Sequence, residues 1–161
     1  MRIYRVFDRA YRALAMTGEG AARTGGRWNS KGIEVVYASD SLALALLEMM
    51  ANARRKIPPG KVYVTIDIPD DVRVDSLRTQ DLPARWTVAP APRRLAEIGD
   101  DWIRRKKTLA LLVPSAIVPV EHNVLLNPAH ADFKRLAIGS PQRIPVDPRL
   151  QIPNARRTRR R

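Results

Sequence analysis

The chain has 161 residues, of which 45% are apolar and 28% charged, a composition typical of one globular domain with a real core. Lys and Arg number 29 against 16 Asp and Glu, which gives a net charge of +13, and there is no cysteine. These values exclude a mainly disordered chain, a disulfide framework, thiolate metal sites and a cysteine nucleophile. With only His122 and His130, a multi-histidine metal centre is not expected either.

The lack of a recognisable targeting signal and the distribution of charge suggest a cytoplasmic protein with one domain. No apolar run reaches the roughly 18 residues that span a bilayer, and the first residues, MRIYRVFDRAYRALAM, lack the apolar stretch of a signal peptide. Residues 154–161, NARRTRRR, carry five arginines and no acid. We therefore expect a domain over 1–153 and a flexible basic tail over 154–161. Such a tail is either an arm for nucleic acid or an acidic partner, or a solvated end without a dedicated role.

The first half of the chain predicts three strands and one long helix. In chain order the expected elements are a strand at 3–7, a helical turn at 10–16, a glycine-rich loop at 18–26 and a strand at 34–38. A helix over 42–55 follows, with Ser41 or Asp40 as its N-cap, and it stops before Pro58 and Pro59. Residues 61–68 alternate with period two and predict another strand.

The second half predicts more short strands around one further helix. In chain order we expect a segment at 72–77 that extends or pairs with the strand at 61–68, an irregular crossing at 83–92, a helix at 93–106, a buried strand at 109–113, an extended piece at 123–126, and weak strands at 133–138 and 143–146. The fold class is therefore α+β: one compact domain of short mixed or antiparallel strands with a few helices.

A glycine-rich motif, GGRWNSKG at 25–32, is the first candidate for chemistry. Paired glycines allow the backbone to approach a ligand closely, and the fork of Arg27 suits a carboxylate or phosphate. A hairpin turn with an exposed arginine explains the glycines equally well. The motif is no P-loop, because the spacing and the Lys-Ser/Thr pair of that motif are missing.

A single acid on the helix expected over 42–55 is the second candidate. Glu48 is the only charged residue between Asp40 and Arg54, and its neighbours are apolar. Its carboxylate either reaches solvent on a narrow polar stripe or points into a cleft, and periodicity alone favours the stripe.

The third candidate is VPSAIVP at 113–119, with the polar residues that follow it. Ser115 is either a hydrogen-bonding wall of a pocket or a turn residue. His122, Asn123 and Asn127 could shape the acceptor side of a site, although roles in turns and packing account for them better.

Together these segments resemble a known family. GGRWNSKG, VVYAS, the LLE of the long helix, VPSAIVP and NVLLNPAH stand in the order found in the RES domain, which is named for its Arg, Glu and Ser residues. The resemblance runs from about residue 3 to residue 148. It implies a fold similar to that of ADP-ribosyltransferases. It also implies the toxin of a type II toxin–antitoxin system, neutralised by a cognate Xre-like antitoxin, that consumes NAD by degrading it or by ADP-ribosylating a protein.

The resemblance also implies roles for individual residues. Glu48 would be the catalytic carboxylate that stabilises an oxocarbenium-like ribose, and Arg27 would act beside it on the pyrophosphate or the riboses of NAD. Tyr37 would stack on nicotinamide and Ser115 would line the pocket, with Asn29 and Lys31 of the glycine-rich motif as further NAD-binding residues. NAD would be a substrate, since no Rossmann fingerprint is present, and no cofactor or metal is expected.

Several points stay open at this stage. The ribosyl acceptor is water, phosphate or a protein side chain. Lys31, Arg54, Arg55 and Lys56 either steer an anionic substrate or form a solvated surface. An alternative function is a basic nucleic-acid-binding or ribonuclease toxin, for which the charge of +13 argues and the aromatic content of 6% argues against. A third reading is a pure interaction protein.

Overall fold

The computed structural model describes residues 1–53, 58–144 and 147. Its described strands form one sheet in the order β4-β5-β6-β2-β1-β3-β7, and β8 also pairs with β3. The strands are β1 (Arg2–Asp8), β2 (Val36–Ser39), β3 (Lys61–Asp67), β4 (Val74–Ser76), β5 (Ala110–Pro114), β6 (His122–Leu126), β7 (Ala137–Ile138) and β8 (Gln142–Arg143). Neighbouring strands are antiparallel except for β4 and β5, which confirms the α+β class.

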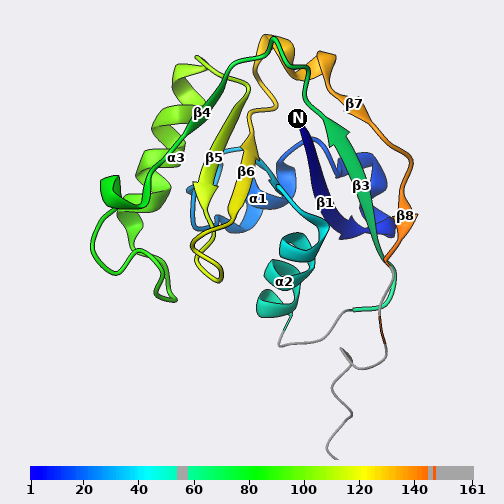
Figure 1. Ribbon diagram of the computed structural model, residues 1–161, viewed down its shortest axis with the longest axis horizontal. Coiled ribbons are helices and arrows are strands. Elements are labelled where there is room, and N and C mark those ends of the chain that lie inside the picture. Colours follow the sequence, from blue (N-terminus) through cyan, green and yellow to red (C-terminus); the bar gives the residue numbers. More distant parts are fainter. Residues whose placement is uncertain (54–57, 145–146, 148–161) are drawn as a thin grey trace, which may run out of the picture.

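Helices flank this sheet at two places. The α-helices are α1 (Glu19–Thr24), α2 (Leu42–Asn52) and α3 (Arg93–Arg105), and short 3-10 helices cover Arg9–Leu14, Thr79–Asp81 and Ala131–Arg135. In Figure 1, α3 lies beside β4 and β5 at one end of the molecule, whereas α2 lies below the middle of the sheet. The middle of the sheet, where β6, β2 and β1 are neighbours, is where the candidate residues gather.

Two apolar clusters cover the two faces of the sheet. Because side chains alternate along a strand, Ala110 of β5 and Val124 of β6 join one cluster, while Leu111 and Leu125 join the other. The first cluster also contains buried residues of β1 and β3. The second, which we call the tryptophan cluster, holds Trp28, Trp86 and Trp102 together with Leu95, Ile103 and Val113. It packs α3, the glycine-rich motif and the 83–92 crossing onto β5 and β6.

The long helix α2 begins where the sequence indicates. Ser41 has extended backbone, and its side chain accepts a hydrogen bond from the N–H of Leu44 at 3.1 Å, so it is the N-cap. Leu44 and Ala45 are buried and fix the face that points inward. The expected end of the helix at 55 and the basic residues Arg54, Arg55 and Lys56 lie outside the described residues, as does the expected basic tail at 154–161.

Three predictions of local structure need correction. The expected loop at 18–26 contains α1, because Gly18 (φ 82°) and Gly25 (φ 70°) bracket an alanine-bearing segment that can coil into one turn. The segment at 72–77 does not pair with β3: its β4 runs parallel to β5 instead. The first half of 133–138 lies in a 3-10 helix, and only Ala137–Ile138 pairs with β3.

Candidate active site

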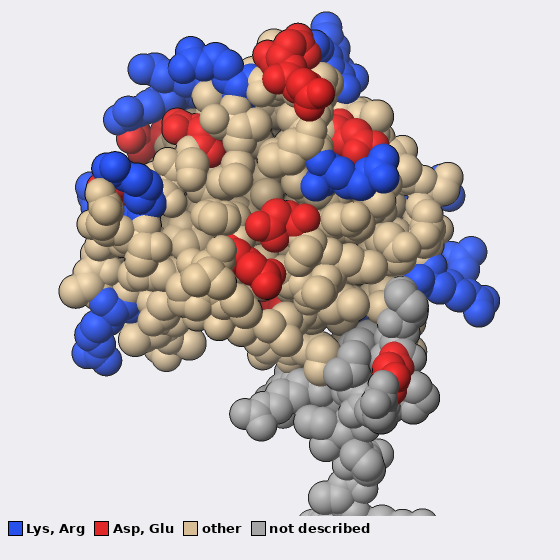
Figure 2. All heavy atoms as spheres, in the orientation of Figure 1, with Lys and Arg blue, Asp and Glu red and all other residues tan. Residues whose placement is uncertain are grey.

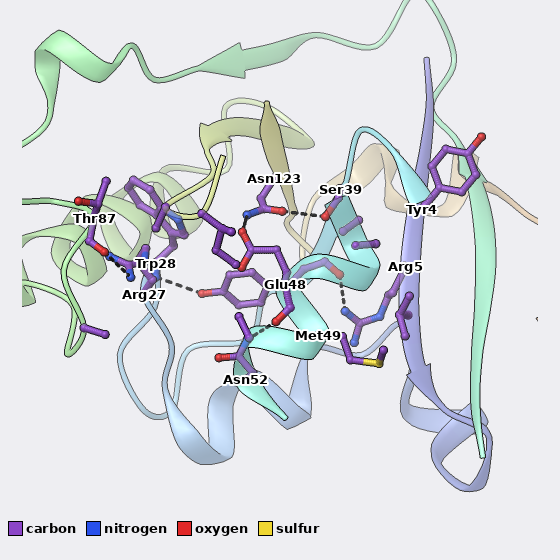
Figure 3. Close-up of a pocket in the computed structure, with 18 residues that line it drawn as sticks. Tyr4, Arg5, Arg27, Trp28, Ser39, Glu48, Met49, Asn52, Thr87 and Asn123 are labelled. Carbon is purple, nitrogen blue, oxygen red and sulfur yellow. Dashed lines mark hydrogen bonds between the residues drawn. The ribbon is translucent and has the colours of Figure 1, made fainter. Parts of the chain in front are cut away.

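A cavity of about 610 Å³ lies between α2 and the central strands. Its wall includes Glu48 and Met49 from α2, Tyr37 to Ser39 from β2, and Tyr4 to Val6 from β1. Residues 27–28, 87, 89 and 116–117 complete the wall from the side of the tryptophan cluster. Figure 3 shows Arg27 and Thr87 at one end, Arg5 at the other, and Glu48 between them.

Glu48 points into this cavity rather than onto a solvated stripe. Its Oε1 accepts hydrogen bonds from the Ser115 hydroxyl at 2.8 Å and from Nδ2 of Asn123 at 2.5 Å. Its Oε2 takes part in no hydrogen bond within the described part of the chain. One carboxylate oxygen is therefore held by the protein, while the other remains available to a ligand.

Ser115 lies behind the carboxylate and not on the cavity wall. Its side chain is fully buried, and its oxygen accepts hydrogen bonds from the backbone N–H groups of Ile117 and Val118, both at 3.1 Å. With both lone pairs engaged, the hydroxyl proton is directed to Glu48. Ser115 thus fixes the carboxylate and the 116–118 backbone at the same time.

Asn123 is held in one amide orientation by Ser39. The two residues face each other in the β2–β6 register, and the Ser39 hydroxyl donates a hydrogen bond of 2.7 Å to Oδ1 of Asn123. The amide nitrogen therefore faces Glu48. The sequence offered Asn123 only as a weak candidate and gave no reason to single out Ser39, since their pairing depends on the register of two distant strands.

Arg27 lies on the cavity wall, but its guanidinium is bound to backbone. It donates hydrogen bonds to the carbonyl oxygens of Trp86, of Thr87 at 3.5 Å and of Val88 at 3.2 Å. It forms no ion pair within the described residues. Burial lowers the pKa of Arg27, and the nearby charge of Glu48 acts in the opposite direction.

Tyr37 and Asn29 hold the glycine-rich motif in shape. The Tyr37 hydroxyl accepts from the N–H of Trp28 at 3.1 Å and donates to Oδ1 of Asn29 at 2.8 Å. A Cβ on Gly26 would stand 2.7 Å from that hydroxyl, which explains the glycine there. Burial raises the pKa of Tyr37, so its hydroxyl stays protonated at neutral pH.

The two other residues expected to bind NAD are not on the cavity wall. The Asn29 amide is buried and donates to the carbonyl oxygens of Ala21, Ser30 and Ile33 at 3.0 to 3.1 Å. Lys31 is exposed and does not line the cavity. Asn29 thus holds the backbone of the motif in place, and of the motif only residues 27 and 28 reach the wall.

Helix α3 packs against the glycine-rich motif. A Cβ on Gly99 would stand 1.9 Å from the carbonyl oxygen of Trp28, so helix and motif touch through their backbones. On the next residue of the helix, Oδ1 of Asp100 accepts from the N–H of Ser30 at 2.9 Å. The position of Arg27 therefore depends on a glycine and an aspartate about 70 residues further along the chain.

Arg5 is a second cation on the wall, and sequence reasoning missed it. Its guanidinium donates to the carbonyl oxygens of Ala15 at 2.6 Å and Tyr37 at 2.5 Å. Burial lowers the pKa of Arg5 to about 10, so the group stays charged at neutral pH. Its position inside a strand, between two residues of the apolar core, carries no motif that would have marked it.

The remaining polar candidates have structural contacts. Asn127 is buried away from the cavity, and its amide donates to the carbonyl oxygen of Ile103 at 2.9 Å. The backbone N–H of His122 donates to Oδ2 of Asp40 at 3.1 Å. Within the described ranges no cluster of three or more His, Cys, Asp and Glu side chains is arranged to hold a metal ion. No helix in those ranges has the length and apolarity to cross a membrane.

The order of these motifs and their convergence on one cavity define the class of protein. The chain belongs to the RES domain family, whose family model matches residues 2–147. This confirms the resemblance identified from the sequence.

Individual relatives make the membership more specific. "Toxin Res" of Yersinia enterocolitica is 38% identical over 152 residues, which are 94% of this chain and 100% of the relative. "Prs ADP-ribosylating toxin" of a Sphingobium species is 39% identical over 145 residues, with 88% and 90% covered. Among solved structures, a chain of the M. tuberculosis MbcT–MbcA toxin–antitoxin complex matches with a TM-score of 0.66 and 21% identity, over 89% of this chain and 83% of that one. The last likeness shows a shared fold.

Proposed function

We propose that this protein is the toxin of a toxin–antitoxin pair and cleaves the bond between nicotinamide and ribose in NAD. The observation that carries the proposal is Glu48, whose Oε1 is fixed by Ser115 and Asn123 while Oε2 faces a cavity large enough for a nucleotide. The names of the relatives support it, since one is an ADP-ribosylating toxin and others are called Toxin Res.

The chemistry needs few groups. The nicotinamide of NAD is cationic on its ribose and leaves as a neutral molecule, so no general acid has to protonate it. Positive charge develops on the ribose as the bond breaks, and the Glu48 carboxylate stabilises that charge. The two neutral donors on Oε1 hold the carboxylate in place, so little reorganisation is needed when the ribosyl cation forms.

The remaining wall residues would bind the rest of NAD. The ring of Tyr37, whose hydroxyl is tied to the glycine-rich motif, offers a fixed face on which nicotinamide can stack. Arg27 is the cation beside Thr87, suited to the pyrophosphate or the riboses. NAD acts as substrate, and no separate cofactor is required. The ADP-ribosyl group then passes to a protein side chain, to water or to phosphate.

A cognate antitoxin, Xre-like by family resemblance, is the proposed partner. The similar fold in a toxin–antitoxin complex supports such a partner, and a free NAD-consuming enzyme in the cytoplasm would harm its host. We propose that the antitoxin closes the cavity. Nicotinamide release should therefore stop in the complex, and full activity in the complex would contradict this part of the proposal.

The alternative of a nucleic-acid-binding toxin receives no support from the charge distribution in Figure 2. On that face Lys and Arg stand mainly at the edges, while the centre is uncharged apart from acidic side chains. A protein that follows a phosphate backbone would present a continuous basic stripe. Nucleic acid contact, if any, is assigned to the antitoxin or to the basic residues at 154–161.

The test is nicotinamide release from NAD by the purified chain. Glu48→Gln keeps the shape of the side chain but removes its charge, and we expect release to fall on the order of 1,000-fold. Glu97→Gln on the exposed face of α3 is the matched control and should retain wild-type release. A thermal unfolding curve of each variant shows whether the fold is kept.

The acceptor is identified in the same assay. Release that depends on phosphate indicates phosphorolysis, release in plain buffer indicates hydrolysis, and labelling of a protein in cell extract by adenine-labelled NAD indicates a transferase. The proposal is contradicted if the wild-type chain neither releases nicotinamide nor labels any protein, above all if it binds RNA in a salt-sensitive manner.

A further inference from the structure

Residues 83–92, which we call the strap, cross the end of the cavity at Arg27 without helix or strand structure. The N–H of Trp86 donates to the carbonyl of Pro83 at 3.2 Å, and the N–H of Val88 donates to that of Arg85 at 3.1 Å. These two turns leave the carbonyl oxygens of 86, 87 and 88 without backbone partners. All three accept hydrogen bonds from Arg27.

The strap is held from two sides. Trp86 is 8% exposed and packs in the tryptophan cluster, while Thr87 and Ala89 form part of the cavity wall. Figure 3 shows the Arg27 guanidinium reaching the Thr87 backbone from across this end of the cavity. The contact with Arg27 is therefore the one that ties the strap to the glycine-rich motif on the cavity side.

The partners of Arg27 are neutral although the group is charged. Three carbonyl oxygens solvate the cation, no carboxylate pairs with it in the described chain, and burial lowers its pKa. The oxygens of a diphosphate carry negative charge and accept two parallel N–H bonds from a guanidinium, which makes them stronger acceptors than carbonyls. In Arg27, Nη1 donates to one carbonyl and Nη2 to two. Because both forks of a guanidinium, Nε with Nη2 and Nη1 with Nη2, include Nη2, a diphosphate bound by either fork competes with these carbonyl contacts.

We propose that Arg27 is shared in turn by the strap and the substrate. In the free protein the Arg27 guanidinium donates its hydrogen bonds to the carbonyl oxygens of 86–88. When a dinucleotide binds, its diphosphate replaces these carbonyls as the acceptor, and the strap is released from the glycine-rich motif. The identity of that diphosphate as part of NAD rests on the proposed function. Arg27 then couples substrate binding to movement of the wall at Thr87 and Ala89, and it favours ligands with a diphosphate over nicotinamide riboside.

Hydrogen exchange of the strap amides in the full chain tests this directly, with ADP-ribose as the probe because it has the diphosphate but no bond to cleave. In the free wild type, Trp86 and Val88 should be protected. Arg27→Ala should speed exchange in 83–92 about tenfold, which corresponds to a loss of about 1.4 kcal/mol. Saturating ADP-ribose should have a similar effect on wild type and no further effect on Arg27→Ala.

Three controls keep the result interpretable. Exchange in β5 and β6 reports whether a variant is folded, and Arg27→Lys, which keeps the charge but not the fork, should give an intermediate rate. Arg94→Ala removes an exposed arginine that forms an ion pair with Glu97, and strap exchange should not change. Nicotinamide riboside should leave the strap of the wild type protected.

The proposal is overturned if the strap exchanges equally in wild type and Arg27→Ala, or if ADP-ribose leaves the strap of wild type unchanged or more protected. Nicotinamide release measured in the same samples separates the two claims. Release from NAD with an unresponsive strap contradicts only the exchange at Arg27. A strap that responds to ADP-ribose while NAD is never cleaved supports the exchange and contradicts the proposed function.

Discussion

The two ends of the candidate site are built in opposite ways. At Glu48, side chains hold a side chain: Ser115 and Asn123 both bind Oε1, and Ser39 and the 117–118 backbone fix those two donors. At Arg27, an irregular segment of backbone holds the cation through three carbonyl oxygens. The first end suits a group that must not move during a reaction, and the second suits a group that exchanges partners.

Among the residues that support Glu48 and Arg27, removing a donor from the Glu48 end should have the largest effect. Asn123→Ala takes one of the two hydrogen bonds from Oε1 of Glu48, and we expect kcat for nicotinamide release to fall about 100-fold. Gln80→Ala, an exposed amide on the surface, is the control and should leave kcat unchanged. If Asn123→Ala keeps wild-type kcat while the fold is intact, the fixed carboxylate is not needed for the reaction.

The contact between α3 and the glycine-rich motif, which positions Arg27, can be broken at a residue that does not line the cavity. A Cβ on Gly99 would overlap the Trp28 carbonyl oxygen at 1.9 Å, so Gly99→Ala should lower the free energy of unfolding by about 1–3 kcal/mol. Gly20→Ala is the matched control, since nothing lies within 4 Å of its added Cβ in α1. There we expect a gain of about 0.5–1 kcal/mol.

Denaturant unfolding of both variants measures the difference. Equal stabilities would mean that α3 and the glycine-rich motif are not in backbone contact. Nicotinamide release by Gly99→Ala at a temperature where it remains folded should show a raised KM, because the contact positions Arg27 and not Glu48.

The smallest effect is expected at Ser39, which acts on Glu48 only through Asn123. Ser39→Ala removes the donor to Oδ1 of Asn123 and should lower kcat about fivefold, with KM unchanged. In the Asn123→Ala background the same substitution should have no further effect, since the amide that Ser39 orients is gone. Additive losses in the double variant would contradict a role through Asn123.

The two ends of the site differ in how much of their structure could be predicted from the sequence. Glu48 was recognisable as a lone acid on an apolar helix, and Ser41 or Asp40 as the cap of that helix, because both signals are local. Periodicity alone nevertheless favoured a solvated stripe for Glu48, and only the family resemblance placed it in a site. The partner Asn123 lies 75 residues away and reaches Glu48 only through the register of β2 and β6, which no local pattern states. Asn29 was expected to bind NAD because it lies in the glycine-rich motif. In the structure its amide instead donates hydrogen bonds to backbone carbonyl oxygens.

The Arg27 end was less predictable still. The sequence indicates a fork aimed at an anion, but its contacts in the structure are backbone carbonyls, which any residue type can supply. The crossing at 83–92 was expected to be irregular and is so, but its contact with Arg27 depends on turn geometry. Arg5 had no signal because a charged residue in a strand is ordinarily read as its solvent face.

Steady-state nicotinamide release by Glu48→Gln and Arg27→Lys, measured side by side over a range of NAD concentrations, tests the central claim most directly. We predict that Glu48→Gln lowers kcat on the order of 1,000-fold with KM within about threefold of wild type. Arg27→Lys should raise KM about tenfold with little change in kcat. Wild-type kcat in Glu48→Gln, or a loss confined to kcat in Arg27→Lys, would contradict the division between a fixed catalytic end and an exchanging binding end.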